Sequence, residues 1–318
     1  MRSSTSDSKR RALVYAKALV GMCAVLLLGL ETLAVHLARH HSATYIRVSR
    51  ELSEAAKVRP ARPGEPVSVL MVGNSLLLAG VDLQHLREKA SESMRVYPVF
   101  LEATGYYDWL YGLCRLFRQG SRPQVVVVGL PVNSFLADGV RQDYAPKMLL
   151  DARDILRVAS DSHLDRTATS NLLLAHASTF WDTRGVLRTH ILSGMVPQFE
   201  VLLSFVQPKW AIPQGPEFEV LAISRFRALD KLCGLYGAKL VMVVPPTPSS
   251  ESAVRRITIA SQRAGVDTLV PVNPTALSAR YYQSDELHLN SEGAALFTTA
   301  LAELLPQTIA EERQAARP

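Results

Sequence analysis

The stretch SVLMVGNSL, residues 68–76, places a polar turn directly after a short apolar run. The run is rich in aliphatic side chains and is bounded by a proline and a glycine, a composition typical of a buried strand. Residues 76–93 have helical composition, so Ser75 is expected where a strand passes into a helix. Ligands bind at this edge of an open α/β sheet, and free backbone N–H groups are available there. The alternative is that Asn74 or Ser75 only caps the helix.

A second polar cluster, SDELHLNSEG at residues 284–293, precedes the segment 294–305, which is predicted to be an amphipathic helix that closes the fold. Asp285 and His288 lie three residues apart in this cluster. A loop can turn both side chains to one side, so that the carboxylate accepts the imidazole Nδ1–H and Nε2 remains free for a hydroxyl. Such pairs also occur in helix caps, and the prediction of a serine nucleophile depends on the combination with Ser75.

Predicted strands and helices alternate along the rest of the chain, which indicates an α/β fold with a doubly wound parallel sheet. Further strands are expected at residues 94–101, 124–130, 239–244 and 266–272, and helices at 106–119, 218–236 and 251–264. Gly105 and Asn133 follow the second and third strands. Because the carboxyl ends of parallel strands meet at one edge, we expect both residues to lie near Ser75 and the Asp285 loop.

These segments together resemble the SGNH (GDSL-like) hydrolases: Gly-Asn-Ser is similar to the first block of that family, and Asp-x-x-His to the last. The resemblance implies a flavodoxin-like three-layer α/β sandwich that acts on acyl esters. It implies Ser75 as the nucleophile, with Asp285 and His288 completing a catalytic triad. It also implies two oxyanion donors, the Gly105 N–H and the Asn133 side chain.

Two of the blocks depart from the usual family pattern. Asn74 stands where the first block usually has an aspartate, and Gly129 and Asn133 are four residues apart where the third block is usually Gly-x-Asn-Asp. An asparagine after a strand is also a common turn residue, and a glycine such as Gly105 is common there for backbone reasons. Both readings of these two positions stay open at the level of the sequence.

The N-terminal region predicts a membrane anchor. Residues 18–38 are dominated by Leu, Val and Ala and are long enough to span a bilayer as a helix. The tail at residues 1–17 carries Arg2, Lys9, Arg10, Arg11 and Lys17, so the positive-inside rule predicts a cytoplasmic tail and an extracytoplasmic remainder. This pattern is typical of a single-pass protein of a bacterial-type inner membrane with a periplasmic domain. A cleavable signal peptide is the alternative, disfavoured by the length of the apolar region and the lack of a clear cleavage site.

The remaining chain divides into a linker with a short helix at 39–65, a catalytic domain at 66–311 and a tail at 312–318. Within the domain, residues 136–214 are expected to form a helical insertion between the third and fourth strands, with helices at 148–158, 171–180 and 186–206. Apolar stripes at helical spacing usually mean burial, so core packing is favoured over a lid or a membrane or partner contact. Asp182 and His190 in this insertion are predicted to be structural.

Composition excludes several classes of function. The formal charge of +6 comes largely from the tail, and no basic stripe interleaved with aromatics indicates a nucleic-acid partner. Cys23, Cys114 and Cys233 form no Cys-x-x-Cys pair or Cys/His cluster, so no metal is expected. Cys114 and Cys233 are predicted to be separate buried thiols, with a disulfide as the alternative. No glycine-rich phosphate loop is present, and no nucleotide cofactor is expected.

The function expected from the sequence is therefore an extracytoplasmic, serine-dependent acyl-ester enzyme. Its resemblance to membrane-anchored SGNH proteins implies O-acyl transfer to, or removal from, an envelope or secreted glycan through an acyl-Ser75 intermediate. In some such systems a separate membrane protein delivers the acyl donor. The alternatives are an esterase acting on lipids or small esters, and a non-catalytic envelope scaffold that keeps the fold, because fold alone does not fix function.

Overall fold

The computed structural model describes residues 4–185, 188, 215–247, 251–273 and 276–315. Its centre is a five-stranded sheet in the order β2-β1-β3-β4-β5, with every neighbouring pair parallel. The strands are β1 Val67–Gly73, β2 Met94–Phe100, β3 Val125–Gly129, β4 Lys239–Val243 and β5 Asp267–Leu269. This is the flavodoxin-like order of a doubly wound sheet, which confirms the α/β fold expected from the sequence.

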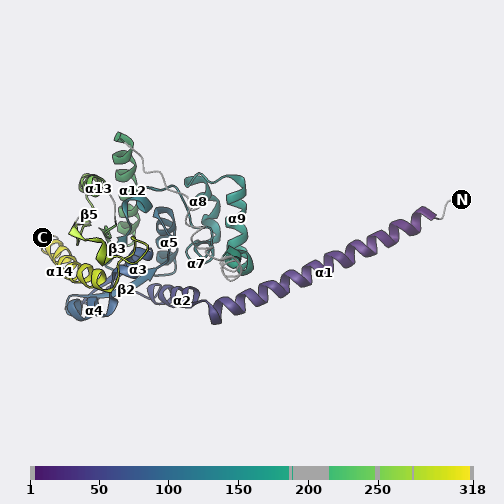
Figure 1. The fold of residues 1–318 in the computed structure, drawn as a ribbon, viewed down its shortest axis with the longest axis horizontal. Helices are drawn as coiled ribbons and strands as arrows, with labels where there is room; N and C mark the ends of the chain where they lie inside the picture. Colours follow the sequence, from purple (N-terminus) through teal and green to yellow (C-terminus); the bar gives the residue numbers. More distant parts are fainter. Residues whose placement is uncertain (1–3, 186–187, 189–214, 248–250, 274–275, 316–318) are drawn as a thin grey trace.

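Helices cover both faces of the sheet and produce three layers (Figure 1). The two faces of β1 show the division, because Leu70 and Val72 belong to one buried cluster and Val69 and Met71 to the other. The first cluster is completed by α5 (Tyr106–Arg118), α6 (Val132–Leu136), α12 (Gly215–Leu235) and α13 (Glu251–Ala264). The second is completed by α3 (Ser75–Gly80), α4 (Leu83–Ala90) and α14 (Ser291–Ala315).

The segment after β1 contains two helices where the sequence predicts one at 76–93. The first, α3, ends at Gly80, and Asp82 caps the second by accepting the N–H groups of Gln84 and His85 at 3.0 Å each. A carboxylate at this position satisfies backbone donors that a continuous helix would have used internally. The polar cap therefore interrupts a segment whose composition is helical throughout.

The described part of the insertion packs into the core. It contains α7 (Ala145–Met148), the 3₁₀ turn η1 (Ala152–Asp154), α8 (Ile155–Asp161) and α9 (Arg166–Ala177), so the helices predicted at 148–158 and 171–180 begin and end elsewhere. Leu149, Leu150, Ile155, Val158 and Leu172 are buried in the larger cluster. The helix predicted at 186–206 lies, apart from residue 188, outside the described residues, and so does His190.

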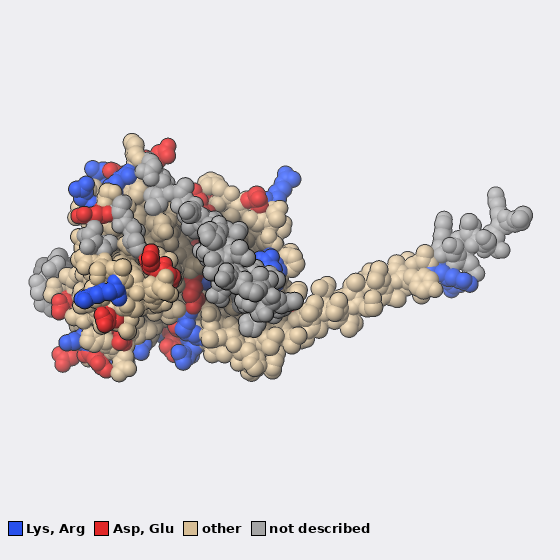
Figure 2. Space-filling view, in the orientation of Figure 1, with Lys and Arg blue, Asp and Glu red and all other residues tan. Residues whose placement is uncertain are grey.

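The N-terminal region forms two helices, α1 (Ser4–His41) and α2 (Ala43–Ala55). Between Arg10 and His41, α1 is long and apolar enough to cross a membrane, and its most apolar 18-residue window has a mean hydropathy of 2.2. Figure 2 shows it extending from the domain as a rod almost free of charged side chains beyond its basic N-terminal end. In contrast, α2 packs on the domain, with Val48 and Ala55 in the larger core cluster. Part of the expected linker is thus a helix that packs against the domain beside β2.

Candidate active site

Two glycines at the carboxyl ends of β1 and β3 fix where Ser75 lies. Gly73 and Gly129 are paired in register, and a Cβ on Gly129 would lie only 2.1 Å from Cδ1 of Leu77. The absence of both side chains therefore lets α3 pack directly on the ends of the two strands. Asn74 is the N-cap of this helix, with its Oδ1 accepting the Leu76 N–H at 3.1 Å. Ser75 follows as the first residue of α3.

The loop before α14 brings a histidine and an aspartate to this serine. Ser75 Oγ lies 2.8 Å from His288 Nε2, and His288 Nδ1 lies 2.5 Å from Asp285 Oδ2. The carboxylate can only accept at Nδ1, so Nδ1 carries the proton and Nε2 is the acceptor for the Ser75 hydroxyl. An antiparallel bridge between Tyr282 and Leu289 closes the loop that holds the pair. In this order a hydroxyl, an imidazole and a carboxylate can act as nucleophile, base and orienting group.

Asp285 is held in its ionised form. Burial acts to raise its pKa, but hydrogen bonds from the His288 ring and from the N–H groups of His288 and Leu287 outweigh it and lower the pKa to about 2. Both N–H groups lie 3.0 Å from Oδ1, while Oδ2 faces the imidazole. The carboxylate is thus oriented by its own loop and remains charged at neutral pH, as required to stabilise an imidazolium.

The Ser75 N–H is one candidate donor to an oxyanion. As the first amide of α3, it belongs to the helix-terminal groups that have no partner within a helix. Among the described residues, no acceptor forms a hydrogen bond with it, whereas the next amide is occupied by Asn74. When Ser75 Oγ attacks a substrate carbonyl, the negative oxygen that forms can therefore accept a hydrogen bond from the free N–H of Ser75.

The Gly105 N–H, the second expected donor, is occupied by a side chain. It donates to Asp108 Oδ2 at 2.9 Å, in a capping interaction at the start of α5. Asp108 is buried, and its Oδ1 accepts the Arg141 N–H at 3.1 Å. Burial raises the pKa of Asp108 to about 7 although these two N–H groups and the Arg141 charge oppose the rise. An oxyanion could use the Gly105 N–H only after the bond to Asp108 had opened.

Asn133, the third expected donor, lies in α6 with an exposed side chain. Its Oδ1 accepts the Ser134 N–H at 2.9 Å, and within the described chain its amide NH₂ has no hydrogen-bond partner. The loops after β2 and β3 touch here, since a Cβ on Gly105 would lie 2.9 Å from the Ser134 carbonyl oxygen. The structure therefore places Gly105 beside the Asn133 segment, while only Ser75, His288 and Asp285 are joined by direct hydrogen bonds.

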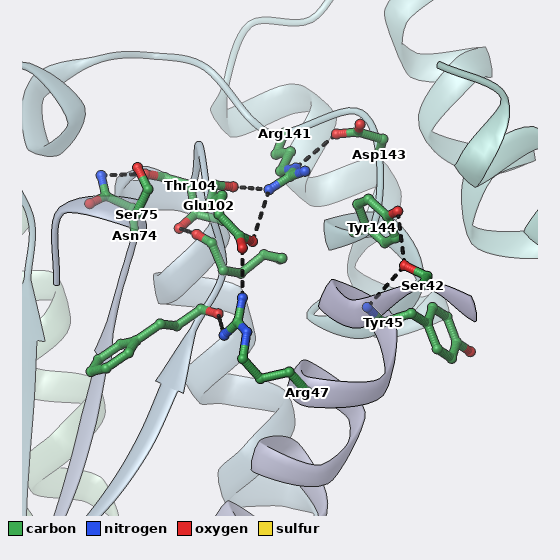
Figure 3. A network of polar contacts seen from close by, with 12 residues as sticks. Ser42, Tyr45, Arg47, Asn74, Ser75, Glu102, Thr104, Arg141, Asp143 and Tyr144 are labelled. Atoms are coloured by element: carbon green, nitrogen blue, oxygen red, sulfur yellow. Dashed lines mark hydrogen bonds and ion pairs between the residues drawn. The ribbon is translucent and has the colours of Figure 1, made fainter. Parts of the chain in front are cut away.

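A polar network that sequence reasoning missed supports the loop carrying Gly105 (Figure 3). Asn74 Nδ2 donates to the Thr104 carbonyl at 3.3 Å and so joins the Ser75 turn to this loop. The Glu102 side chain forms an ion pair with Arg47 of α2, with 2.7 Å between Oε1 and Nη2. The Arg141 guanidinium donates a hydrogen bond to the backbone carbonyl of Glu102. These partners are tens of residues apart, and no local pattern in the sequence pairs them.

Other expected site features have the following outcomes. Among the described residues, no group of three or more His, Cys, Asp or Glu side chains is placed to hold a metal ion. Cys114 is half-buried and Cys233 is buried, and both are free thiols in this structure. Asp182 is buried, burial raises the pKa of its carboxyl to about 7, and it forms no hydrogen bond with Ser75, His288 or Asp285.

Comparisons with known proteins found likenesses of structure only. No protein-family model matches the chain, and no curated protein matches it. Similar solved structures include TesA, with 11% identity over 75% of this chain and 97% of that chain and a TM-score of 0.39. A protein of Slackia heliotrinireducens assigned to the SGNH hydrolases has 13% identity, coverages of 76% and 100% and a TM-score of 0.40. A catalytic mutant of an acetylxylan esterase from Geobacillus stearothermophilus has 10% identity, coverages of 76% and 94% and a TM-score of 0.39.

Proposed function

We propose that this chain is a membrane-anchored, serine-dependent acyl-ester enzyme, with Ser75 as nucleophile, His288 as general base and Asp285 as the residue that orients it. The observation that carries the proposal is the continuous hydrogen-bonded series from Ser75 Oγ to His288 Nε2 at 2.8 Å and from His288 Nδ1 to Asp285 at 2.5 Å. The imidazole lies between the carboxylate and the hydroxyl, so it can take the hydroxyl proton while the carboxylate stabilises the resulting imidazolium.

The proposed reaction has two steps. Ser75 Oγ attacks the ester carbonyl while its proton passes to His288 Nε2, and the resulting imidazolium is paired with Asp285. Nε2 then returns the proton to the departing alkoxide, which leaves an acyl group on Ser75. In the second step Nε2 takes a proton from water or from a sugar hydroxyl, whose oxygen attacks the acyl-Ser75 ester, and the same proton returns to Ser75 Oγ.

Charge on the tetrahedral oxygen is stabilised by the Ser75 N–H and, in this proposal, by the Asn133 amide. Each such donor contributes on the order of 3 kcal/mol to the transition state. The Gly105 N–H joins them only when Asp108 releases it. Opening this capping interaction before or during substrate binding is thus part of the proposed catalytic cycle.

The proposed substrate class is an O-acylated glycan of the cell envelope or a secreted glycan, with an acyl group transferred to it or removed from it. The apolar helix α1 supports attachment to a membrane, and the basic residues before it support a periplasmic position for the domain. We include delivery of the acyl donor by a separate membrane protein in the proposal. Hydrolysis of lipid or small-molecule esters uses the same first step and differs in the acceptor.

A non-catalytic scaffold is a second candidate, and one observation favours it. Asp108 occupies the Gly105 N–H, the donor that an SGNH-type oxyanion hole would use. If that hydrogen bond persisted in the presence of substrate, the site would have one backbone donor fewer than the proposed chemistry uses. The two candidates therefore differ in whether Ser75 reacts with an acylating or phosphonylating reagent.

Labelling with a fluorophosphonate probe tests this difference on the full chain in detergent micelles. We expect the wild-type chain to be labelled, Ser75→Ala to lose the label, and Ser91→Ala, a change at an exposed serine at the end of α4, to be labelled as wild type. Wild-type protein that stays unlabelled would favour the scaffold. For a labelled enzyme, incubation with acyl donor and glycan separates the activities, because a transferase accumulates acyl-glycan and an esterase releases free acid.

A further inference from the structure

The exposed part of α1 is shorter than the helix itself. Every residue from 10 to 29 is exposed, whereas Ala34 and Ala38 are buried and Glu31 is partly buried. At 1.5 Å per residue the exposed stretch is about 30 Å long, which equals the hydrocarbon thickness of a bilayer. If α1 spans the membrane over this stretch, the span lies nearer the N-terminus than the 18–38 expected from the sequence: Arg10 and Arg11 mark its cytoplasmic end, and Lys17 reaches the headgroups with its long side chain. The helix then leaves the bilayer near residue 30, and its remaining turns pack partly against protein.

Glu31 joins this level of α1 to the insertion. Its carboxylate accepts the Ser178 hydroxyl at 2.6 Å and the N–H groups of Thr179 and Phe180 at 2.7 and 3.0 Å. Residues 179–185 are helical, so Glu31 satisfies the otherwise unpaired first amides of that helix. Three charge-assisted hydrogen bonds therefore attach the insertion to α1 just after the end of its exposed stretch.

The helix just before this contact, α9, exposes an uncharged face. Its sequence after Arg166 contains no Asp, Glu, Lys or Arg, and its exposed positions include Leu173 and Leu174, which are 43% and 45% exposed. Ala177 is also exposed and immediately precedes Ser178, the partner of Glu31. Exposed leucines thus lie within about one helical turn of the point at which α1 would enter lipid.

The arrangement of the elements agrees with this placement. Figure 1 shows α8 and α9 on the side of the domain toward which α1 extends, whereas α13, α14 and β5 lie on the opposite side. A bilayer crossed by the exposed part of α1 would therefore face α9. Two exposed leucines on an uncharged helix face suit the boundary between headgroups and acyl chains, where a surface helix buries its apolar side.

We propose that the C-terminal half of α9, with Leu173, Leu174 and Ala177, is a second membrane contact that rests in the outer-leaflet interface beside α1. The occupant of this surface is lipid, because α1 and the Glu31 contact place the surface at the membrane boundary. The domain is then held in one orientation by two points of attachment. This inference rests on the proposed membrane anchoring and is independent of the proposed chemistry at Ser75.

Site-directed fluorescence in liposomes tests the proposal. The full chain, with Cys23, Cys114 and Cys233 replaced by alanine, receives one cysteine labelled with a nitrobenzoxadiazole dye at Leu173, Leu174, Leu26 or Leu235. Leu26 reports on the exposed part of α1, and Leu235, 72% exposed at the end of α12, is the matched control on the domain. Vesicles of phosphatidylcholine and phosphatidylglycerol carry a nitroxide near the headgroup, and iodide serves as the aqueous quencher.

We expect the lipid nitroxide to quench labels at positions 173 and 174 at least about twofold more than the label at 235, with the opposite order for iodide. Two positions are used so that a local disturbance at one of them does not decide the result. Labels at 173 and 174 that behave like 235, while the label at 26 is in lipid, would overturn the proposal and leave the anchor intact. A label at position 26 that is open to iodide would overturn the anchoring and this inference together.

Discussion

Replacing Asp285 by asparagine separates the chemistry of the carboxylate from its structural role. Asp285 Oδ1 accepts two backbone N–H groups of its own loop, while Oδ2 accepts the proton of His288 Nδ1. Asparagine keeps one carbonyl oxygen for the two amides and places an NH₂ group opposite Nδ1. The imidazole then adopts the tautomer with its proton on Nε2, which faces Ser75 Oγ and can no longer accept the hydroxyl proton.

The size of the effect follows from the loss of the base. A triad aspartate that is changed to asparagine with its geometry intact lowers the rate by about 10⁴-fold, which corresponds to roughly 5.5 kcal/mol in the barrier. Asp285 has a side chain that is 47% exposed, so water screens part of its interaction with the imidazolium. We therefore expect a smaller loss, of about 10³-fold.

The assay is the second-order rate of fluorophosphonate labelling of the full chain at pH 8. Asp82→Asn is a matched control, because Asp82 Oδ1 also accepts two backbone N–H groups, of the residues two and three positions ahead, at 3.0 Å each. Asp82 has no part in the Ser75 site, and its asparagine variant should be labelled at the wild-type rate. A labelling rate of Asp285→Asn within about threefold of wild type would refute the tautomer argument.

Three further changes have defined outcomes. Because the pKa of Asp285 is lowered to about 2 from 3.8, its contribution to stability is present above about pH 4 and is lost as the pH falls toward 2. The free energy of unfolding of wild type should thus exceed that of Asp285→Asn by about 1 kcal/mol at neutral pH, after allowance for screening, and this excess should shrink below pH 4 and become small near pH 2, as measured by chemical denaturation. Gly129→Ala should displace α3 and lower the labelling rate by about tenfold or more, whereas Gly234→Ala, with no atom within 4 Å of the added Cβ, should not. Arg47→Met should lower the free energy of unfolding by about 2–3 kcal/mol, because it leaves the buried Glu51 carboxylate without its cationic partner.

The sequence predicts the sheet well because its strands are buried on both faces. The runs that become β1 and β3 are almost entirely aliphatic, and all their residues are buried in the structure. A strand covered by helices on both faces needs no alternation, so an apolar run between turn residues is a sufficient signal. The turn residues at the strand ends then identify the edge at which Ser75 lies.

The spacing of Asp285 and His288 likewise predicts their contact, because a three-residue loop confines both side chains to one neighbourhood. The state of Gly105 could not be predicted in this way. Asp108 lies three residues after it, where an acidic side chain can reach back to the N-cap N–H in a capping box, so the spacing allows this bond, but only the structure shows that it forms. The packing of α2 against the domain could not be predicted from the sequence either. Its hydrogen bonds to the Phe100 carbonyl and the Glu102 carboxylate join segments about fifty residues apart.

The most direct test of the proposed mechanism is the identification of an acyl-enzyme. The full chain is mixed with p-nitrophenyl acetate, quenched in the early phase and digested, and the modified peptide is located by mass spectrometry. The proposed mechanism predicts a burst of p-nitrophenol equivalent to the enzyme and an acetyl group on Ser75, both lost in Ser75→Ala. Absence of a burst in the wild-type chain, or an acetyl group on a residue other than Ser75, would contradict it.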